Sequence, residues 1–262
     1  QGTLTGKNGA WDLIAQRVGS VSKYADNFSE IYAHINGPND IKFTDVSNAI
    51  AAFMEFEWRS DTAPFDMFLK EQKTLSITAK KGLDLFYGVG GCASCHSGAL
   101  LTDHEFHAMG QPQVGPGKAA RFQSHARDEG RFRVTGLDVD KYAFRTPSLR
   151  NVKLTGPWGH AGAYSDLTAF VAAHADPRAG LTNYNRLGIV LPQFDVADWR
   201  IMDDPAEVAA ISKAVSIDPV SLSSDEVSAL VAFLGSLTDT SAQVGRLGVP
   251  KSVPSGLAVP NP

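Results

Sequence analysis

The five residues Cys92-Ala93-Ser94-Cys95-His96 constrain this chain more than any other stretch. They match the pattern CxxCH, which is the attachment signal of c-type haem. Two thiols three positions apart can each form a thioether with one vinyl group of a single porphyrin, and the adjacent imidazole can then bind the iron. The motif therefore predicts covalent haem c, with His96 as one axial ligand.

Two other kinds of site also use paired cysteines. A thioredoxin-like motif belongs to a βαβ unit, and a zinc site needs two further Cys or His ligands at short spacing. Neither context is visible around residues 92–96, and both cysteines of the chain lie inside the motif. Covalent haem is the favoured interpretation, and a redox or structural CxxC is the alternative.

Composition and charge exclude several classes of partner. The 262 residues are 43% hydrophobic and carry a net charge of −4, without a run of Lys and Arg, so neither nucleic acid nor an anionic membrane is expected as a partner. No apolar run is long enough to span a bilayer, and the first residues lack the regions of a signal peptide. We expect the periplasm from the cofactor itself, because haem is attached to cysteines on the outer side of the bacterial inner membrane.

Apolar periodicity predicts a mainly helical chain. Helices are expected over residues 11–18, 23–34, 44–57, 64–70, 76–86, 167–174, 205–215 and 224–237. Thr44 is the expected N-cap of the third helix. The apolar face of this helix, with Ile50, Phe53 and Met54, is expected to be core, and so is Trp58 just after it. Gly, Pro and polar residues predict long loops from 97 to 165 and from 177 to 203. The expected fold is a cytochrome c-like haem domain with long loops wrapping the haem.

The second axial ligand decides whether a haem iron transfers electrons or binds ligands. The candidates are four methionines and the six histidines besides His96: Met54, Met67, Met109, Met202, His34, His104, His107, His125, His160 and His174. Three of the methionines suit core positions, and a ligand at 107 or 109 would need a sharply folded loop. His174 lies on the apolar face of the predicted helix 167–174, where an imidazole needs a partner. A buried histidine bonded to the backbone is the alternative.

Several further blocks resemble the bacterial di-haem cytochrome c peroxidases and their MauG-like relatives. These blocks are LDLF at 83–86 before the haem motif, Phe106-His107, DEGRFRVTG at 128–136, FRTPSLRNV at 144–152, LTGPWGHAG at 154–162 and the helix 222–237. Together they cover roughly residues 40–240 in order, which is far more specific than a lone CxxCH.

The resemblance implies which residues hold the haem. In this family the C-terminal lobe binds a six-coordinate, electron-transferring haem, and its second axial ligand lies on the short helix that corresponds to 167–174. That position is His174 here, Met in typical peroxidases and Tyr in MauG. The resemblance therefore implies a haem with two histidine ligands, His96 and His174, and a lower reduction potential than a His/Met pair would give.

The resemblance implies roles for further residues. Arg145 and Arg150 suit the haem propionates, since a guanidinium binds a carboxylate with two hydrogen bonds, and ordinary surface arginines are the alternative. His107 and His160 would orient propionates or the loop, and Trp158 would relay electrons at the haem edge unless it is a packed aromatic. The backbone carbonyls of Thr155 and Pro157 match positions that help to bind calcium. No residue can be named as a catalytic acid or base.

Family members carry a second CxxCH in an N-terminal lobe, whose haem meets peroxide, and this chain has only one such motif. We expect residues 1–75 to be a helical segment linking to a missing or separate haem lobe, 76–240 to be the haem domain and 241–262 to be an extended Pro-rich tail. The expected function is electron transfer within a di-haem peroxidase or MauG-like oxidase, with an electron-donor protein or protein substrate as a further partner. The alternatives are a mono-haem electron carrier and a haem-based sensor.

Overall fold

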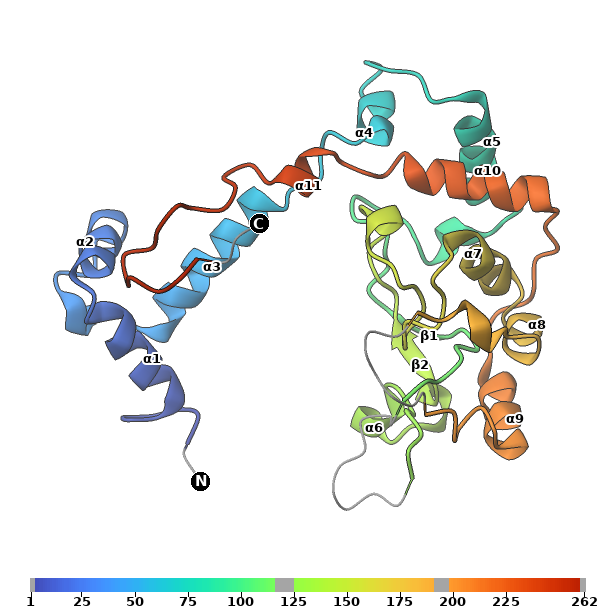
Figure 1. Ribbon diagram of the computed structural model, residues 1–262, viewed down its shortest axis with the longest axis horizontal. Coiled ribbons are helices and arrows are strands. Elements are labelled where there is room, and N and C mark those ends of the chain that lie inside the picture. Colours follow the sequence, from blue (N-terminus) through green and yellow to red (C-terminus); the bar gives the residue numbers. More distant parts are fainter. Residues whose placement is uncertain (1–2, 116–124, 191–197, 260–262) are drawn as a thin grey trace. The chain divides into compact units, whose positions relative to one another are not determined.

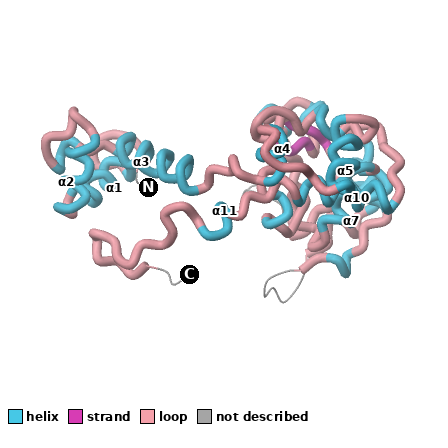
Figure 2. Tube along the Cα trace, turned by 90° about the horizontal axis from the view of Figure 1, so that it is seen from above, coloured by secondary structure: helices cyan, strands magenta, loops and turns pink. Residues whose placement is uncertain are grey.

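The computed structural model describes residues 3–115, 125–190 and 198–259. Helices dominate these residues, and the two short strands are the only ones there (Figure 2), so the predicted mainly helical fold is confirmed. The chain divides into two compact units, residues 1–59 with 240–262, and residues 60–239. Parts of both predicted loops and the end of the predicted tail, at 116–124, 191–197 and 260–262, lie outside the described residues.

The first unit is a small helical cluster. Its elements are α1 (Ala10–Gly19), α2 (Ser22–Ile31), the 3-10 turn η1 (Pro38–Asp40), α3 (Phe43–Glu57) and α11 (Ser241–Val244). Its buried core consists of Ala25, Ile35 and Ile41, with Val46 of α3 packed against it. This core is small because few apolar side chains of the unit converge on one point.

Helix α3 differs from the prediction in two ways. It begins at Phe43, after Lys42 as N-cap, because the Asp45 carboxylate accepts a hydrogen bond from the Lys42 backbone N–H at 2.8 Å; Thr44 is therefore not the cap. The side chains of Ile50, Phe53 and Met54 are 53%, 44% and 43% exposed, and Trp58 is also exposed, so none of them is core. The unit's core reaches only the first turns of α3, where Val46 lies.

A buried carboxylate holds the C-terminal segment within the first unit. Glu57, the last residue of α3, accepts hydrogen bonds from the backbone N–H groups of Arg246, Leu247 and Gly248 at 3.0, 2.6 and 3.2 Å. The chain after α11 therefore has a fixed attachment to α3 although it forms no further helix or strand before residue 260.

The second unit contains the haem motif (Figure 1). Its helices are α4 (Pro64–Leu69), α5 (Ile77–Tyr87), α6 (Phe132–Thr135), α7 (Leu167–Ala175), α8 (Pro177–Thr182), α9 (Pro205–Ala214) and α10 (Ser224–Gly235), its 3-10 turns are η2 (Cys92–Ser94), η3 (Asp138–Asp140), η4 (Val152–Leu154) and η5 (Arg186–Gly188), and its strands are β1 (Phe106–Ala108) and β2 (Ala143–Arg145). Within this unit α10 packs against both α5 and α7.

The main core lies between α5 and α10. Phe86 of α5 meets the ring of Phe233 of α10, with 5.0 Å between centroids, and both side chains are buried. Gly82 lets the two helices approach, because a Cβ at this position would overlap the backbone carbonyl of Ala229. Ser76 and Ser223 cap the two helices by accepting hydrogen bonds from the N–H groups of Ala79 and Glu226, as Ser does at helix N-termini.

Residues 60–75 belong to the second unit, whose boundaries are 60 and 239. The fully buried carboxylate of Asp239, just after α10, accepts hydrogen bonds from the backbone N–H groups of Asp61 and Thr62 at 3.0 and 2.8 Å. The Thr62 hydroxyl donates to the same carboxylate. This contact joins the two ends of the unit.

The two predicted loops contain more regular structure than expected. Strands β1 and β2 pair antiparallel, with Phe106 opposite Arg145 and Ala108 opposite Ala143, and α6, η3 and η4 lie in the same region. Helix α8 begins where α7 ends, because the Asp176 side chain accepts from the Ala179 N–H and Pro177 occupies the first turn, a position that proline favours.

No helix in the described part of the chain combines the length and apolar character needed to cross a bilayer.

Candidate haem-binding site

The CxxCH segment follows α5 through a glycine-rich turn. Gly91 adopts φ +66°, a left-handed conformation that glycine takes without a steric penalty, and η2 starts at Cys92. Cys92 packs against the main core, and burial raises the pKa of its thiol. Both thiols are half-buried and form no disulfide, so they are placed on one short turn at the edge of the core.

The imidazole of His96 is oriented by the backbone. Its Nδ1 lies 3.1 Å from the carbonyl oxygen of Leu101, a buried residue. A carbonyl can only accept, so Nδ1 carries the proton and Nε2 keeps its lone pair for a metal ion. Burial lowers the pKa of His96, which favours the neutral imidazole that metal binding requires.

His174, near the end of α7, faces His96. The two ring centroids are 6.3 Å apart and the rings are inclined by 50°. The Nδ1 atom of His174 is buried and has no hydrogen-bond partner among the described residues. Burial, and next the neighbouring His96, lower the pKa of His174 to about 4. The side chain is therefore a neutral imidazole at neutral pH, held in a position where an unbound ring nitrogen is unfavourable.

The separation of the two rings fits one iron ion between them. An imidazole nitrogen lies about 2 Å from a bound metal ion and about 1 Å from its own ring centre, so two imidazoles on opposite sides of an ion have centroids roughly 6 Å apart. The 6.3 Å between His96 and His174 matches this value. The residues present thus fit a haem attached at Cys92 and Cys95 with two histidine ligands.

Asp103 and His107 lie beside the motif. His107, in β1, has its Nε2 2.8 Å from the Asp103 carboxylate, and the Asp103 N–H donates to the carbonyl of Cys95 at 2.8 Å. Ligand atoms of Cys95, Asp103 and His107 lie within 4.8 Å of one another. Since Cys95 belongs to the haem-attachment motif, this group is part of the same site and fixes the loop that follows His96.

The two arginines predicted to meet propionates have different surroundings. Arg150 binds the Asp66 carboxylate at 2.6 Å and donates two hydrogen bonds to the carbonyl of Ala99, so it connects α4 to the loop after the motif. Arg145 is exposed, and its Nη2 lies 2.6 Å from Nδ1 of His104. Arg150 thus has strong partners within the chain, whereas Arg145 lies at the surface.

Trp158 and His160 are fixed by contacts within the loop that precedes α7. The indole Nε1 of Trp158 donates to the carbonyl of Val152 at 2.8 Å, and its side chain packs against the main core. His160 stacks on Phe144 with 3.6 Å between ring centroids, and its Nε2 lies 2.9 Å from the Asp128 carboxylate. Neither ring stacks on His96 or His174 in the contacts of the described residues.

Thr155 and Pro157 flank Gly156 at the end of η4. The Thr155 hydroxyl donates to the carbonyl of Val152 at 3.2 Å, and the peptide between Gly156 and Pro157 is cis. The two residues lie just before Trp158 in the sequence.

The other histidines have different neighbours. His34 lies beside Asp45 in the first unit, His104 beside Arg145 and His125 beside Glu129. Among the four methionines, Met54 is exposed on α3. Met202 packs against a small cluster of buried residues that includes Leu181 and Ile211. Of the candidates considered from sequence, only His174 has its ring against His96 in the described contacts.

Sequence reasoning identified the apolar face of the helix that carries His174, including Phe170, but not the aromatic contacts that continue beyond this helix. Phe170 stands one turn before it on α7 and contacts it, and Tyr164 contacts Phe170. The i, i+4 spacing of Phe170 and His174 is visible in the sequence. Tyr184 and Trp199, which continue the same series of rings, give no local signal.

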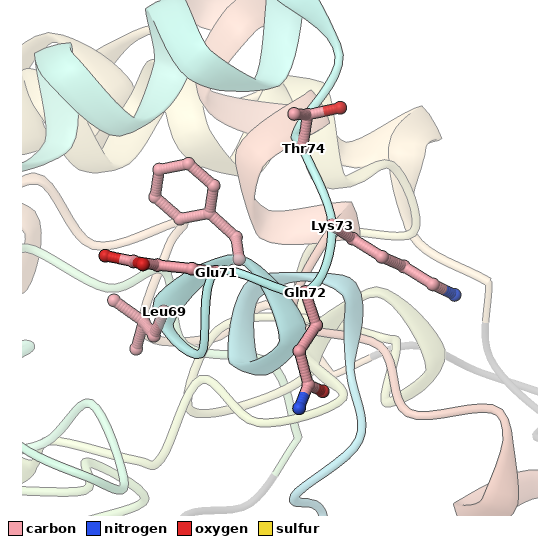
Figure 3. Close-up of a pocket in the computed structure, with 6 residues that line it drawn as sticks. Leu69, Glu71, Gln72, Lys73 and Thr74 are labelled. Atoms are coloured by element: carbon pink, nitrogen blue, oxygen red, sulfur yellow. The ribbon is translucent and has the colours of Figure 1, made fainter.

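A surface depression of about 920 Å³ lies at the end of α4 and on the segment that follows it (Figure 3). Its lining residues are Phe68, Leu69, Glu71, Gln72, Lys73 and Thr74. All six come from one continuous stretch, and none is a histidine or cysteine. We assign it no part in binding the haem iron.

A CxxCH turn whose histidine faces a second imidazole across the space of one metal ion, inside a mainly helical unit, defines a c-type haem protein. The family model described as di-haem cytochrome c peroxidase matches residues 5–74. The chain is similar to the di-haem cytochrome c peroxidases and MauG proteins, and the cofactor that this family implies is covalently bound haem c.

Individual relatives show this similarity. The chain is 33% identical over 169 residues to the cytochrome c551 peroxidase of Pseudomonas aeruginosa, covering 64% of this chain and 46% of the relative. It is 33% identical over 163 residues to the methylamine utilization protein MauG of Methylorubrum extorquens, covering 62% and 42%. The chain thus spans about half the length of the curated relatives it matches.

Solved structures share the fold. A MauG-like protein associated with microbial copper homeostasis has a TM-score of 0.65 and 25% identity, with 91% of this chain and 65% of that chain covered. The di-haem peroxidase BthA of Burkholderia thailandensis has a TM-score of 0.54 and 19% identity, with 97% and 64% covered. The arrangement of helices described above is therefore the fold of di-haem peroxidases.

Proposed function

We propose that this chain carries the six-coordinate, electron-transferring haem of a di-haem peroxidase or MauG-like oxidase. Cys92 and Cys95 hold the haem covalently, and His96 and His174 are its two axial ligands. The observation that carries this proposal is the 6.3 Å between the two imidazole rings, which leaves room for one iron ion and for no further ligand along that axis.

The chain's own residues define what the site does. A bound haem supplies one-electron redox chemistry. The carbonyl of Leu101 holds His96 in the tautomer that binds metal, and α7 holds His174 over the opposite side. If His96 and His174 both held the iron, they would leave peroxide no coordination position, and the haem would supply electron transfer at this site.

The reaction of the whole protein is the reduction of hydrogen peroxide, or the use of peroxide to oxidise a protein or small-molecule donor. It requires a second haem-bearing lobe or chain, and a small electron-transfer protein or protein substrate as redox partner. The names of the relatives, cytochrome c peroxidase and MauG, support this proposal. The proposed location is the periplasm, where haem c is attached.

Further residues are proposed to assist the cofactors. Arg145 is exposed, and among the described residues the hydrogen-bond partner of its guanidinium is the side chain of His104. Its guanidinium is therefore suited to a haem propionate. The proposed role of orienting propionates or the neighbouring loops applies to Arg150, His107 and His160. Trp158 is proposed as an electron relay. The carbonyls of Thr155 and Pro157 are proposed as calcium ligands, because calcium prefers oxygen donors.

The ligand assignment is tested by two substitutions of His174. We expect His174→Met to keep a six-coordinate, low-spin haem and to raise the reduction potential, because a thioether ligand favours the reduced iron. We expect His174→Ala to give a haem that is high-spin and binds carbon monoxide when reduced. Optical and electron paramagnetic resonance spectra and redox titration measure these changes.

His34→Ala, a histidine of the first unit beside Asp45, serves as the control and should leave spectrum and potential unaltered. If both His174 variants keep the low-spin spectrum and potential of the parent chain, His174 is not the axial ligand and the proposal is wrong.

A further inference from the structure

A series of aromatic rings leads away from His174. Phe170 lies 5.2 Å from His174 and 5.4 Å from Tyr164, measured between ring centroids. Tyr164 lies 5.3 Å from Tyr184, which in turn lies 5.9 Å from Trp199. Each step is within the range of direct aromatic contact, so the rings form one unbroken series.

The series begins in the interior and ends near the surface. Phe170 is on α7, and Tyr164 is buried just before this helix, where its backbone pairs with that of Trp158. Tyr184 follows α8, and its hydroxyl donates to the carbonyl of Ala163 at 2.6 Å. Trp199 is only half-buried. Residues from three separate segments therefore connect the proposed iron ligand with solvent.

The charges around Trp199 are balanced. The Arg186 guanidinium lies 4.9 Å from the indole centroid, and a cation in this position makes it harder to remove an electron from the ring. Arg186 is itself paired with Asp203 at 2.6 Å, and Arg200 with Asp198, also at 2.6 Å. The two carboxylates offset the positive charge, so the indole can still exchange an electron.

The two tyrosines keep their phenolic protons. Burial raises the pKa of Tyr164 to about 12 and raises the pKa of Tyr184 as well. The acceptor of the Tyr184 hydroxyl is a backbone carbonyl, which does not take up a proton. These phenols cannot readily be oxidised, so their rings can serve as a bridge for electron tunnelling and cannot store a charge.

We propose an electron-transfer route between the iron at His174 and the protein surface. Its bridge consists of Phe170, Tyr164 and Tyr184, and its last group, at the surface, is Trp199. The inference rests on the proposed function, in which His174 binds the haem iron. One electron passes from a reduced one-electron donor protein at the Trp199 surface to the ferric iron. The donor is oxidised and the iron is reduced, while no bond forms or breaks and no proton moves.

The route is tested by light-driven electron transfer in the full, haem-loaded chain. Both natural cysteines are then thioethers, so Leu187→Cys, at a residue 93% exposed beside Arg186, creates a unique site for a ruthenium polypyridyl photosensitiser. A laser flash with an external electron acceptor converts the label into an oxidant. The oxidant takes one electron from the ferrous haem, and the haem absorbance reports the rate.

Three substitutions separate the parts of the route. We expect Trp199→Phe to slow the oxidation of the haem by about an order of magnitude, because the indole is the only group of the route that can be oxidised in passing. Tyr184→Leu should also slow it, since it removes a ring of the bridge. Tyr184→Phe should leave the rate unchanged, because the ring remains and the phenolic proton plays no part.

Two controls are matched to these variants. A label at Val134→Cys, on α6 and 87% exposed, should give a rate that does not respond to Trp199→Phe. Trp58→Phe, in the first unit, should not change the rate from the label at 187.

Equal rates from that label in the parent chain and Trp199→Phe would overturn the route and leave the rings as packing alone. A slow rate in Tyr184→Phe would overturn the part assigned to the bridge. The low-spin spectrum of each variant, recorded before the flash, tests the two-histidine haem separately, so failure of the route and failure of the proposed function are distinguishable.

Discussion

Asp128 joins three segments of the haem-containing unit through its own polar atoms. Its carboxylate lies 2.9 Å from Nε2 of His160 and accepts from the Gly130 N–H at 3.0 Å. Its backbone N–H and carbonyl both bond the side-chain amide of Gln113. The hydrogen bond from His160 is the main reason why the pKa of Asp128 is lowered. One carboxylate therefore couples the stability of this region to pH.

The direction of that coupling follows from the lowered pKa. The native state favours the ionised carboxylate, so Asp128 stabilises the fold above its unfolded pKa of about 3.9 and loses this contribution as the pH falls through the lower native value. We expect Asp128→Asn to reduce the free energy of unfolding at pH 6 to 7, and the difference from the parent chain to shrink below about pH 4. Urea denaturation of both proteins across this range measures the effect.

Asp26→Asn, at an exposed position of α2, is the control and should give a small difference at every pH. A difference for Asp128→Asn that stays constant from pH 7 to pH 3 would show that the ionised carboxylate is not what stabilises this region.

At the scale of residues, sequence predicts what is local. Cys92, Cys95 and His96 follow from one five-residue pattern, and the placement of His174 on a helix face follows from periodicity. Arg150 contacts Asp66 and Ala99, which lie 84 and 51 positions away in the sequence. No local pattern predicts a contact over such a separation. The rings of Tyr184 and Trp199 escaped prediction for the same reason.

The crossing of α5 and α10 depends on one glycine. A Cβ at Gly82 would overlap the carbonyl of Ala229 and come within 2.8 Å of Cβ of Phe233. Gly82→Ala should therefore destabilise the chain by about 1–3 kcal/mol, since overpacking a well-packed core forces the helices apart. This loss outweighs the gain of roughly 1 kcal/mol that alanine brings to a helix. Thermal or urea denaturation followed by circular dichroism measures the change.

Gly235, the last residue of α10, offers the matched control. A Cβ there would meet only the Lys153 side chain, at 3.6 Å, which is an ordinary contact. Gly235→Ala should be neutral or slightly stabilising. If Gly82→Ala were as stable as Gly235→Ala, close approach at Gly82 would not determine how the two helices pack.

Glu57 gives a second prediction for an element, the C-terminal segment. Its carboxylate accepts from three consecutive backbone N–H groups, those of Arg246, Leu247 and Gly248. Glu57→Gln replaces one accepting carboxylate oxygen by an NH₂ group, which faces backbone N–H donors. The substitution should lower the free energy of unfolding by about 1–3 kcal/mol. We expect faster proteolytic cleavage after residue 244, measured by mass spectrometry of the fragments.

Glu55→Gln changes an exposed carboxylate two residues earlier on α3, paired only loosely with Arg59 at 3.7 Å, and should leave the cleavage rate as it was. Cleavage of Glu57→Gln at the rate of the parent chain would mean that Glu57 does not hold the segment.

At the scale of elements, helices with strong caps were predictable. Ser76, Asp166 and Ser223 each accept a hydrogen bond from the N–H three residues on, as their position before an apolar run indicates. Strands β1 and β2 have three residues each, too few for an alternating pattern. The exposure of Phe53 on α3 could not be foreseen, because apolar spacing shows which face is apolar but not what covers it.

For the molecule as a whole, the number of cysteines sets the number of haems. One haem c takes two thiols, and these 262 residues contain two cysteines, so they can attach one haem c. Mass spectrometry of these 262 residues, purified with their cofactor, should show one haem. A companion chain with a second haem would favour the di-haem enzyme, whereas one haem without a companion would favour the mono-haem electron carrier.

The two imidazoles determine how such a chain reacts on its own. In the proposed site His96 and His174 are the two axial ligands, so the haem-loaded chain should accept electrons from a reduced donor cytochrome but should not oxidise that cytochrome when hydrogen peroxide is added. His174→Ala removes one imidazole, and we expect this variant to bind carbon monoxide and to react slowly with peroxide. Stopped-flow absorbance of the donor and of the haem measures both reactions. Rapid peroxide turnover by the parent chain with one haem and an unaltered low-spin spectrum would contradict a sealed electron-transfer site, because peroxide would then have to react where two histidines leave it no coordination position.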